Sequence, residues 1–376
     1  MEMKRITRCV NCIMDDSSDS TIRFDEQGVC NYCKEALELK NSTYFPNEEG
    51  RKKLDKLMAE IKDSEKDKPY DCIIGISGGL DSSYLAYIAA KYGLRALAIH
   101  IDDGYDTEIS KSNIKKLIEK TGFEYRTVTP DEEQFNDLIL AFMKAGVPNI
   151  AIPQDDILFA FLYDQMKQYH IRYFLSGLNF SLESILQRGN THQYTDVIHI
   201  KELNRLFGTK PINKLKFIDT NQRITDKYVL GYKTVRPLNL IEYNRDKAFR
   251  ELDEYCGFKY YGRKHLENIL TGFVQLYWFP KKFGVDKRTS HLSSMIVSGQ
   301  MTRDEAMKEY GEPLYDEQQM NEWIDFIIKK LGITMETFLE IMEAPSHQHE
   351  EYKVENTTLG YKMRDQAVKI KNTVKR

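Results

Sequence analysis

Short runs of β-forming residues alternate with longer amphipathic stretches along the middle of the chain. The runs are bounded by turn residues, and they predict strands at residues 71–76, 95–101, 124–128 and 172–175. The stretches between and beside them have the length and spacing of helices, which are expected at residues 84–92, 110–120, 131–144 and 155–169. Strands that alternate with helices are typical of a parallel sheet with helices on its faces. The pattern therefore predicts an α/β fold.

The two ends of the chain follow other patterns. A charged, exposed helix is expected at residues 48–65, and beyond about residue 190 the periodicity weakens. The elements expected there are short strands and loops at 201–236, a final sheet element at 237–241, a helix at 245–255 and a basic surface helix or tail at 355–376. We therefore expect three parts, which are a metal module at residues 1–45, an α/β domain at 46–245 and a helical region at 246–376.

A glycine-rich turn, Ser77–Ser83 with the sequence SGGLDSS, joins the first predicted strand to the helix that follows it. This order aims backbone N–H groups and the positive end of a helix dipole at one point, which favours a bound anion. The paired glycines allow close approach to a phosphate, and Asp81 is suited to hold a magnesium ion or to cap the helix. The turn has neither the lysine of kinase and GTPase P-loops nor the G-x-G-x-x-G of dinucleotide folds.

Two further polar turns follow predicted strands, Asp102–Gly104 after the second and Ser176–Asn179 after the fourth. Ligands of such sheets bind beyond the carboxyl ends of the strands, so both turns are expected beside the glycine-rich turn. Asn179 and Glu183 are candidates to contact ligand or metal, with helix capping by Ser181 as the alternative. The candidate nucleotide-binding residues are Ser77, Gly78, Gly79, Leu80, Asp81, Ser82, Ser83, Asp102, Gly177 and Asn179.

Four of the six cysteines, Cys9, Cys12, Cys30 and Cys33, form the spacing C-x2-C-x17-C-x2-C. This spacing lies in the range of a four-thiolate zinc site, in which two turns place four sulfurs around one tetrahedral ion. The segment between the pairs can form a small hairpin that the metal would hold folded. An iron–sulfur cluster and four unrelated buried thiols are the alternatives. Zinc agrees best with the spacing, so a zinc-binding module is expected at the N-terminus.

Composition and charge narrow the class of protein. With 376 residues, of which 41% are apolar and 30% charged, the chain is expected to form two or three units of an ordinary soluble protein. Its net charge of −3 argues against a dedicated nucleic-acid binder. No apolar stretch approaches the roughly 18 residues of a membrane span, and the N-terminus has no apolar signal core. We therefore expect a cytoplasmic protein with reduced cysteines.

The turn Ser77–Ser83 resembles the PP-loop of the ATP pyrophosphatase superfamily, whose pattern is S-G-G-x-D-S-[ST]. That resemblance implies an adenine nucleotide alpha hydrolase-like domain, in which the loop grips the β,γ-pyrophosphate while a substrate oxygen attacks the α-phosphate. Over nearly its whole length, the chain is similar to the N-acetyl sugar amidotransferases of lipopolysaccharide O-antigen and related surface-sugar pathways. The segments that carry this likeness are the first cysteine pair with GVCNYC at 28–33, the PP-loop, KTVRPL at 233–238, KYYGRKHLE at 259–267, and KKFGVDKRTSHLSS at 281–294 followed by SGQ at 298–300.

The family resemblance implies a reaction in which an acetamido group on a sugar becomes an acetamidino group. The amide oxygen is adenylated first, and ammonia then displaces AMP, with ATP, Mg²⁺ and Zn²⁺ as the implied cofactors. Arg263 and Gly272 depart from the family pattern, which usually has a second glycine and a basic residue at these positions. The candidates are Asp81, Lys264, Lys287, Arg288 and His291 as catalytic residues, with Glu183 and His265 as tentative substrate contacts.

The source of ammonia is expected to lie outside this chain. A glutaminase needs a nucleophilic thiolate, on an N-terminal cysteine or on a nucleophile elbow, and residue 2 is Glu2. Outside the metal set, Cys72 lies inside a predicted strand and Cys256 lacks the glycines of an elbow, so both are interpreted as packing residues. The expected partners are therefore a separate glutaminase subunit, as the family implies, and a sugar or nucleotide-sugar substrate.

Two other functions remain open from the sequence. A tRNA-thiolating enzyme is the main alternative, because PP-loops and zinc cysteines also occur together there. Such enzymes need cysteines or a cluster to carry sulfur, and a basic surface for tRNA, which this composition does not favour. A zinc-ribbon interaction protein that only binds nucleotide is the second alternative, and the intact PP-loop with Asp81 argues against it.

Overall fold

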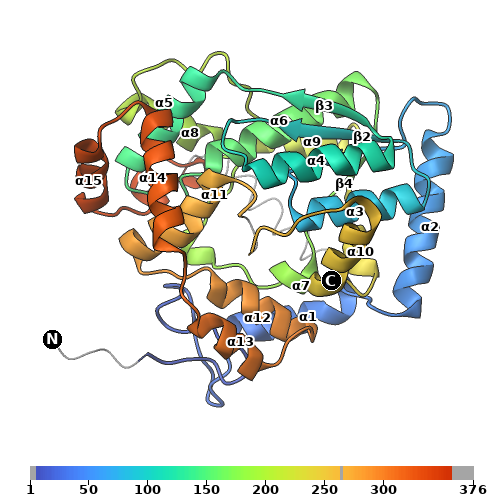
Figure 1. Ribbon diagram of the computed structural model, residues 1–376, viewed down its shortest axis with the longest axis horizontal. Helices are drawn as coiled ribbons and strands as arrows, with labels where there is room; N and C mark the ends of the chain where they lie inside the picture. The colour runs from blue at the N-terminus through green and yellow to red at the C-terminus, as the bar shows by residue number, and fades with distance from the viewer. Residues whose placement is uncertain (1–5, 263–265, 358–376) are drawn as a thin grey trace.

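The computed structural model describes residues 6–262 and 266–357. Its five strands form one parallel sheet in the order β3-β2-β1-β4-β5, with β1 in the centre. Figure 1 labels β2, β3 and β4 of this sheet. The strands are β1 Cys72–Gly75, β2 Ala96–Ile101, β3 Glu124–Val128, β4 Tyr173–Leu175 and β5 Lys233–Val235. The α/β class predicted from the alternation of strands and helices is confirmed.

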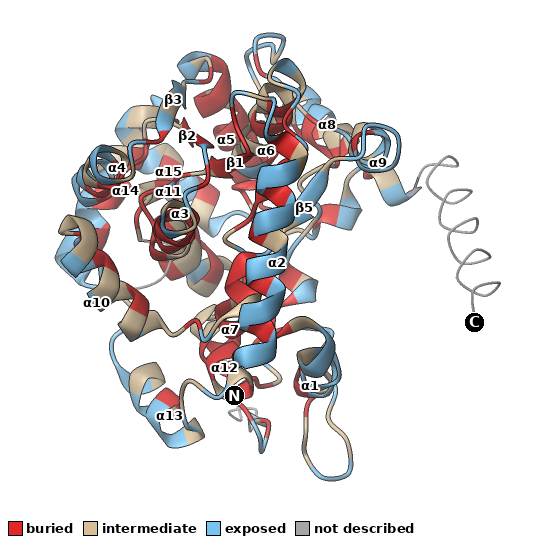
Figure 2. Cartoon of the chain, turned by 90° about the vertical axis from the view of Figure 1, so that its right-hand side faces the viewer, coloured by how far each residue is buried: buried red, intermediate tan, exposed pale blue. Residues whose placement is uncertain are grey.

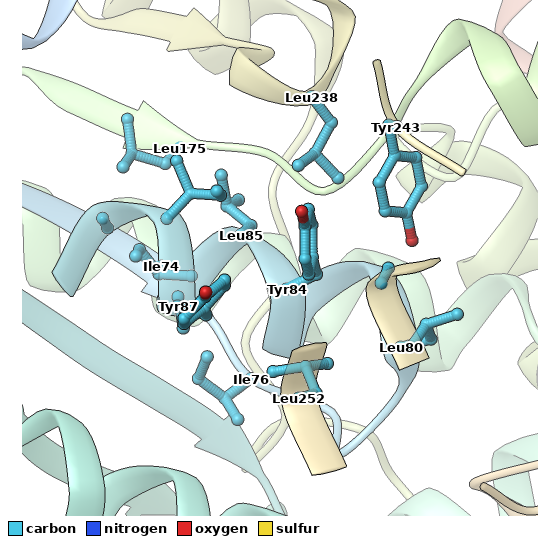
Figure 3. Packing of buried hydrophobic residues seen from close by; sticks show 14 of the residues in the cluster. Ile74, Ile76, Leu80, Tyr84, Leu85, Tyr87, Leu175, Leu238, Tyr243 and Leu252 are labelled. Atoms are coloured by element: carbon cyan, nitrogen blue, oxygen red, sulfur yellow. The ribbon is translucent and has the colours of Figure 1, made fainter. Parts of the chain in front are cut away.

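Successive strand residues point to opposite sides of the sheet, and each face packs into a core of its own. Ile74 and Ala98 pack into one core, which Figure 3 shows around Tyr84 and Leu252, whereas Ile73 and Leu97 belong to the core on the other face. The helices of the first face are α2 Glu48–Glu65, α3 Leu80–Lys91, α4 Glu108–Thr121 and α10 Arg245–Cys256. The second face is covered by α6 Ile152–Gln168. Figure 2 shows that α2 keeps its outer side exposed, as its charged sequence predicts.

A third core forms mainly between helices, beside the sheet. At its centre, Trp278 is fully buried, and its indole N–H donates to the carbonyl of Val147 at 3.0 Å. Trp278 lies on η3, a π-helical segment over Val274–Phe283, which follows the short helix α11. The helices of this core are α5 Glu132–Lys144, α8 Val197–Phe207, α11 Ile269–Phe273, α14 Glu317–Leu331 and α15 Met335–Glu343.

The N-terminal module packs against two helices from the far end of the chain, α12 (Arg288–Ser298) and α13 (Arg303–Gly311) (Figure 1). The backbone N–H of Ile13 donates to Ser293 Oγ at 3.2 Å. The guanidinium of Arg303 donates to the carbonyls of Cys12 and Cys9, at 3.2 and 3.3 Å. The second cysteine pair opens helix α1, Asn31–Thr43, for which Cys30 is the N-cap.

Three expectations about local structure are wrong. Residues 237–241 are not a sheet element: β5 ends at Val235, and Pro237, which has no N–H for a ladder, opens the 3₁₀ turn η2, Pro237–Leu240. Residues 201–236 hold most of α8 and all of α9, Thr220–Tyr228, whose largely polar sequence lacks an apolar stripe. Within the described N-terminal residues, turns with the single bridges Arg8–Asp15 and Phe24–Cys30 replace the hairpin expected between the cysteine pairs.

The expected division at residues 45 and 245 stays a prediction, and both large cores cross the second boundary. Helices α10, α12 and α13 contribute to the core that covers β1, and α11, α14 and α15 share a core with α5 and α8. Among residues 6–262 and 266–357, no helix has the length and apolar character needed to cross a bilayer. The remaining short elements are α7 Phe180–Glu183, η1 Arg188–Asn190, η4 His349–Glu351 and η5 Glu355–Thr357.

Candidate active site

The PP-loop leaves β1 after Gly75 and runs directly into α3. The helix begins at Leu80, four residues earlier than the sequence predicted, with Gly79 as a cap that offers no side-chain hydrogen bond. Inside the loop, Ser77 Oγ lies 3.1 Å from Ser82 Oγ and accepts the N–H of Gly79 at 3.2 Å. The hydroxyls and the first N–H groups of α3 therefore gather at one end of a helix, which is the arrangement of an anion site.

Packing requires a glycine at Gly78 and leaves little room for a side chain at Gly79. Gly78 has a φ of +73°, and a Cβ there would lie 2.5 Å from the backbone oxygen of Ser110. A Cβ on Gly79 would lie 2.6 Å from Glu267 Oε1. A Cβ on Gly177, after β4, would lie 3.3 Å from the N–H nitrogen of Ser82. The turn after β4 thus touches the PP-loop, as the positions of the strand ends predict.

Two tyrosines that the sequence did not single out hold the first turn of α3. The hydroxyl of the fully buried Tyr243 donates to Asp81 Oδ1, and Leu80 donates its N–H to the hydroxyl of Tyr261 at 2.8 Å. Burial raises the pKa of Tyr243 well above its usual range, and the negative charges of Asp81 and Glu183 add to the shift. Asp81 thus binds the hydroxyl of Tyr243 and does not cap the helix, and Glu183 is near enough to influence the same hydroxyl electrostatically.

The turn after β2 is acidic and partly buried. Asp102 Oδ1 accepts the N–H of Gly104 at 3.1 Å. Its neighbour Asp103 was not a candidate from the sequence, yet it is buried and accepts from Gln154 and from Asn268, the latter at 3.2 Å. Burial, with the nearby Asp106 carboxylate, raises the pKa of Asp103 to about 6. The run of acidic residues after a strand was a signal that could have identified it.

Asn179 is the N-cap of α7, and Ser181 is not. Asn179 Oδ1 accepts the N–H of Leu182 at 2.9 Å, while Glu183 Oε2 accepts the N–H of Asn179 at 3.3 Å. The amide group of Asn179 also donates to the carbonyl of Gly177 at 3.1 Å. Its side chain therefore shapes the turn beside the PP-loop.

A small cavity of about 60 Å³ lies between α7, η3, α12 and the start of α10. Its wall includes the predicted residues Lys287, Arg288 and His291, together with Gln275 of the π-helical segment. Arg288 forms a bidentate pair with Asp286, in which Nη2 donates to Oδ2 at 2.7 Å and Nε donates to Oδ1 at 3.2 Å. The apolar part of the wall comes from Leu182, Leu276, Leu292 and Met295. Three further charged residues, Arg245, Asp286 and Glu309, complete the wall.

Lys287 differs from its neighbour because its ammonium lies over the ring of Phe279, 4.9 Å from the centroid, and no carboxylate of the described residues forms an ion pair with it. Burial lowers the pKa of Lys287 to about 8. Two other candidates, Lys264 and His265, lie outside the described residues. The structure therefore brings Lys287 and His291 to one cavity, and it ties Arg288 into an ion pair.

The four predicted cysteines form one cluster, with all four Sγ atoms within 4.8 Å of one another. The Sγ atoms of Cys9 and Cys33 are 4.0 Å apart, and those of Cys12 and Cys30 are 3.8 Å apart. The sulfurs accept backbone N–H groups, including that of Cys30 at 3.2 Å, as thiolate ligands commonly do. All four are fully buried. Four thiolates at this separation fit a tetrahedral zinc ion.

Two family models match separate parts of the chain. Residues 267–366 match the C-terminal domain of LPS biosynthesis protein WbpG-like proteins, and residues 64–178 match asparagine synthase. Among curated proteins, tRNA-specific 2-thiouridylase MnmA 2 of Fusobacterium nucleatum is 28% identical over 119 residues, which are 30% of this chain and 34% of that protein. The matched region thus spans about a third of the length of that relative.

Among solved structures, the chain is similar to NMN synthetase from Francisella tularensis, with 15% identity and a TM-score of 0.37. That match covers 77% of this chain and 98% of the other. The NH3-dependent NAD synthetase from Campylobacter jejuni is also 15% identical, with a TM-score of 0.32, and the match covers 71% and 99% of the two chains.

Proposed function

The chain is an LPS biosynthesis amidotransferase-type protein of the PP-loop superfamily, and from this premise we propose that it converts an acetamido group of a bacterial surface sugar into an acetamidino group. It is an ATP-using ligase that forms a C–N bond. The observation that carries the proposal is the contact between a complete PP-loop and Glu267, the first residue of the WbpG-like domain, at Gly79. ATP cleavage and sugar recognition would then meet at one place.

The reaction proceeds in two balanced steps. The acetamido oxygen attacks the α-phosphate of ATP, the bond to the β-phosphate breaks, and pyrophosphate leaves. Ammonia adds to the activated carbon, AMP departs with the former amide oxygen, and loss of a proton gives the amidine. Adenylation is required because an amide oxygen is otherwise a poor leaving group. Catalysis is largely positioning, with cationic groups offsetting the charge that develops on the phosphates.

The residues divide these tasks. The PP-loop N–H groups and hydroxyls bind the pyrophosphate, and Asp81 with Glu183 would hold Mg²⁺, which neutralises phosphate charge when bound. The cavity lined by Lys287, His291 and Gln275 takes the sugar, with Lys287 as the available cation. His291 is suited to hydrogen-bond the sugar or to move a proton. The four cysteines would hold a structural zinc ion.

An oxygen-labelling experiment tests the proposal directly. N-acetylated nucleotide sugars carrying ¹⁸O in the acetamido carbonyl are incubated with the chain, Mg·ATP and ammonium, and AMP is analysed by mass spectrometry. The label is expected in AMP, with pyrophosphate released in equal amount. Unlabelled AMP would contradict adenylation of the amide. Asp81→Asn, which keeps the size of the side chain, is expected to abolish the release.

A tRNA-thiolating function is the second candidate, supported by the 28% identity to the 2-thiouridylase. It is less favoured because four cysteines form the metal cluster, and burial raises the pKa of both remaining thiols, Cys72 and Cys256. Pyrophosphate release measured with tRNA in place of the sugar distinguishes the tRNA-thiolating function from the sugar amidotransferase function. Release with tRNA alone would favour thiolation, and tight ATP binding without release on either substrate would favour a nucleotide-binding module.

A further inference from the structure

The imidazole of His100 lies between two hydrogen-bond acceptors at the end of β2. Its Nδ1 is 2.8 Å from the carbonyl oxygen of Ile76, and its Nε2 is 2.8 Å from Asp106 Oδ2. The side chains of His100 and Asp106 are only 7% and 5% exposed. A neutral imidazole has only one N–H, whereas an imidazolium donates to the carbonyl of Ile76 and also carries the positive charge that pairs with the Asp106 carboxylate. The geometry therefore favours the charged form.

The contact with Ile76 is at the entrance of the PP-loop. Ile76 directly precedes Ser77, and its own N–H donates to the carbonyl of Ile99 at 2.8 Å. Ile76 is thus the last residue that the sheet holds before the loop begins, and His100 binds its remaining polar group. On its other side, the ring of His100 stacks on Tyr125 with centroids 6.4 Å apart. The imidazole cannot move without moving the start of the loop.

The contact with Asp106 continues to the WbpG-like domain. Asn268 donates to Asp106 Oδ1 at 3.4 Å and to Asp103 at 3.2 Å, and Thr107 donates its N–H to the carbonyl of Glu267 at 3.0 Å. The side chain of Glu267 in turn lies against Gly79. Residues 76–79 are therefore held at both ends by one connected set of contacts, with His100 at one end and Glu267 at the other.

We propose that His100 is a positioning residue, which as an imidazolium sets the start of the PP-loop and links it through Asp106 to the first residues of the WbpG-like domain. When the imidazolium of His100 loses a proton, one of its two contacts, with Ile76 or with Asp106, is lost, and residues 77–79 become looser. The consequence for pyrophosphate binding rests on the function proposed above. The consequence for the loop itself is independent of that function, because it follows from the contacts of His100 alone.

The charges around His100 set the direction of its pH dependence. Burial by itself lowers the pKa of His100, but the hydrogen bond and charge of Asp106, with a smaller effect of Asp102, raise it above its ordinary value. The other groups that face this region are Asp103 on the same turn, Lys111 on α4 and Tyr125 on β3. The imidazolium contacts are therefore complete at low pH and are lost as the pH rises through the raised pKa.

A titration of the full chain by nuclear magnetic resonance tests the positioning role without any ligand. The Cε1–H resonance of His100 reports its protonation, and the amide resonances of Ser77 and Gly78 report the loop. We expect these amides to shift with the same midpoint as His100, and Asp106→Asn to move that midpoint to lower pH. Loop amides that do not follow His100, in a protein whose His100 titrates, would overturn the proposal.

A binding experiment then measures the consequence for ligand. The affinity for inorganic pyrophosphate with Mg²⁺ is determined for His100→Gln and for His347→Gln, a control at an exposed histidine paired with Glu351. At pH 6 we expect His100→Gln to bind about tenfold more weakly than the control, as for loss of one charged hydrogen bond. The ratio of the pyrophosphate affinities of the two variants should approach one as the pH rises through the titration midpoint of His100. Equal affinity at every pH would overturn the positioning role, and absence of binding in all forms would instead contradict the proposed function.

Discussion

At the scale of single residues, the PP-loop depends on the backbone of one glycine. Gly78 combines a positive φ with a site where a side chain would meet backbone atoms of Ser110. Gly231 has nearly the same φ, +71°, but nothing lies within 4 Å of the position of its Cβ. The two glycines therefore separate the cost of the backbone conformation from the cost of steric overlap.

The first prediction compares Gly78→Ala with Gly231→Ala. Both variants place alanine in a left-handed conformation, which costs about 1 kcal/mol, and both change the unfolded chain alike. Only Gly78→Ala must also displace Ser110, so we expect it to lose about 2 kcal/mol more in the free energy of unfolding. Urea unfolding at pH 7 measures this difference. Equal losses would show that the loop has room for a side chain.

Three histidines, His192, His199 and His349, form a buried cluster away from the PP-loop. Their hydrogen bonds form a continuous chain: His349 Nε2 lies 3.2 Å from the N–H nitrogen of Asn149, His349 Nδ1 is 3.0 Å from His199 Nε2, and His199 Nδ1 is 3.3 Å from the carbonyl of Lys353. This chain is satisfied when His199 and His349 are neutral. His192 pairs with Asp196 at 2.8 Å and lies 3.5 Å from Glu350.

The second prediction is a loss of stability in mild acid. Burial, aided by the nearby His192, lowers the pKa of His199 to about 4, and burial lowers that of His349 well below its usual range. The unfolded chain therefore binds more protons below about pH 6.5, and stability falls as the pH drops from there. Between pH 7 and pH 5 the two histidines together are expected to contribute a loss of about 4 kcal/mol, measured by urea unfolding against a chain that lacks them.

Two variants check the origin of this loss. A double variant, His199→Gln with His349→Gln, removes both titrating groups and is expected to flatten the dependence between pH 7 and pH 5. His347→Gln changes an exposed histidine and should retain the dependence of the unaltered chain. If the unaltered chain, the double variant and His347→Gln all lose unfolding free energy at the same rate as the pH falls, the buried histidines are not the cause of the loss.

At the scale of elements, the N-terminal module with its four cysteines supports α12, the helix that carries His291. Ile13, between the cysteine pairs, donates to Ser293 on α12, and Lys40 of α1 donates to the carbonyl of Val297 on the same helix at 2.7 Å. Helix α12 also packs closely on α7, where Ser294 Oγ accepts the N–H of Ile185 at 2.9 Å. The module thus lies behind the wall of the proposed sugar cavity.

The third prediction tests this support with two buried serines of α12. Ser293→Ala leaves the N–H of Ile13 without its acceptor, and it is expected to cost about 2 kcal/mol in the free energy of unfolding. Ser290 donates only within its own helix, to the carbonyl of Lys287 at 2.9 Å, so Ser290→Ala should cost about 0.5 kcal/mol. Similar losses in the two variants, measured in urea, would contradict the support.

The fourth prediction concerns the metal. Elemental analysis is expected to find one zinc ion per chain, because four thiolates surround one position. Removal of zinc by a chelator should lower the melting temperature, since the module has few buried residues of its own apart from the cysteines. Hydrogen exchange should then increase in α1, α12 and α13 but not in β1. Unchanged protection of α12 would show that the module folds independently of it.

At the scale of the whole molecule, the proposed reaction draws on residues from distant parts of the sequence. The PP-loop lies at the carboxyl end of β1, while the cavity lies between α7, η3 and α12. No glutaminase thiolate is evident in the described chain, because four cysteines share the metal cluster, Cys72 is fully buried, and Cys256 Sγ contacts the carbonyl of Leu252 at 3.3 Å.

The fifth prediction follows from the placement of the six cysteines. The purified chain is expected to form amidine from free ammonium and not from glutamine, because it lacks a reactive thiolate to release ammonia. Product formation on an N-acetylated nucleotide sugar is measured by mass spectrometry with each nitrogen source at equal concentration. Activity with glutamine that survives Cys72→Ala and Cys256→Ala together would point to another nucleophile. Loss of glutamine activity in either variant would reveal a glutaminase within this chain.

The sequence by itself determined the alternation of strands and helices over residues 71–175, the place of the PP-loop after β1 and the grouping of the four cysteines. These features rest on local signals, namely periodicity, turn residues and short spacings, which act over a few residues. It did not reveal Tyr243 beside Asp81, Asn268 beside Asp106, or Ser293 beside Ile13, which are separated by 162, 162 and 280 positions. Only the tertiary structure decided these pairs, because they form where distant segments pack together, and no local pattern encodes which partner a polar side chain will meet.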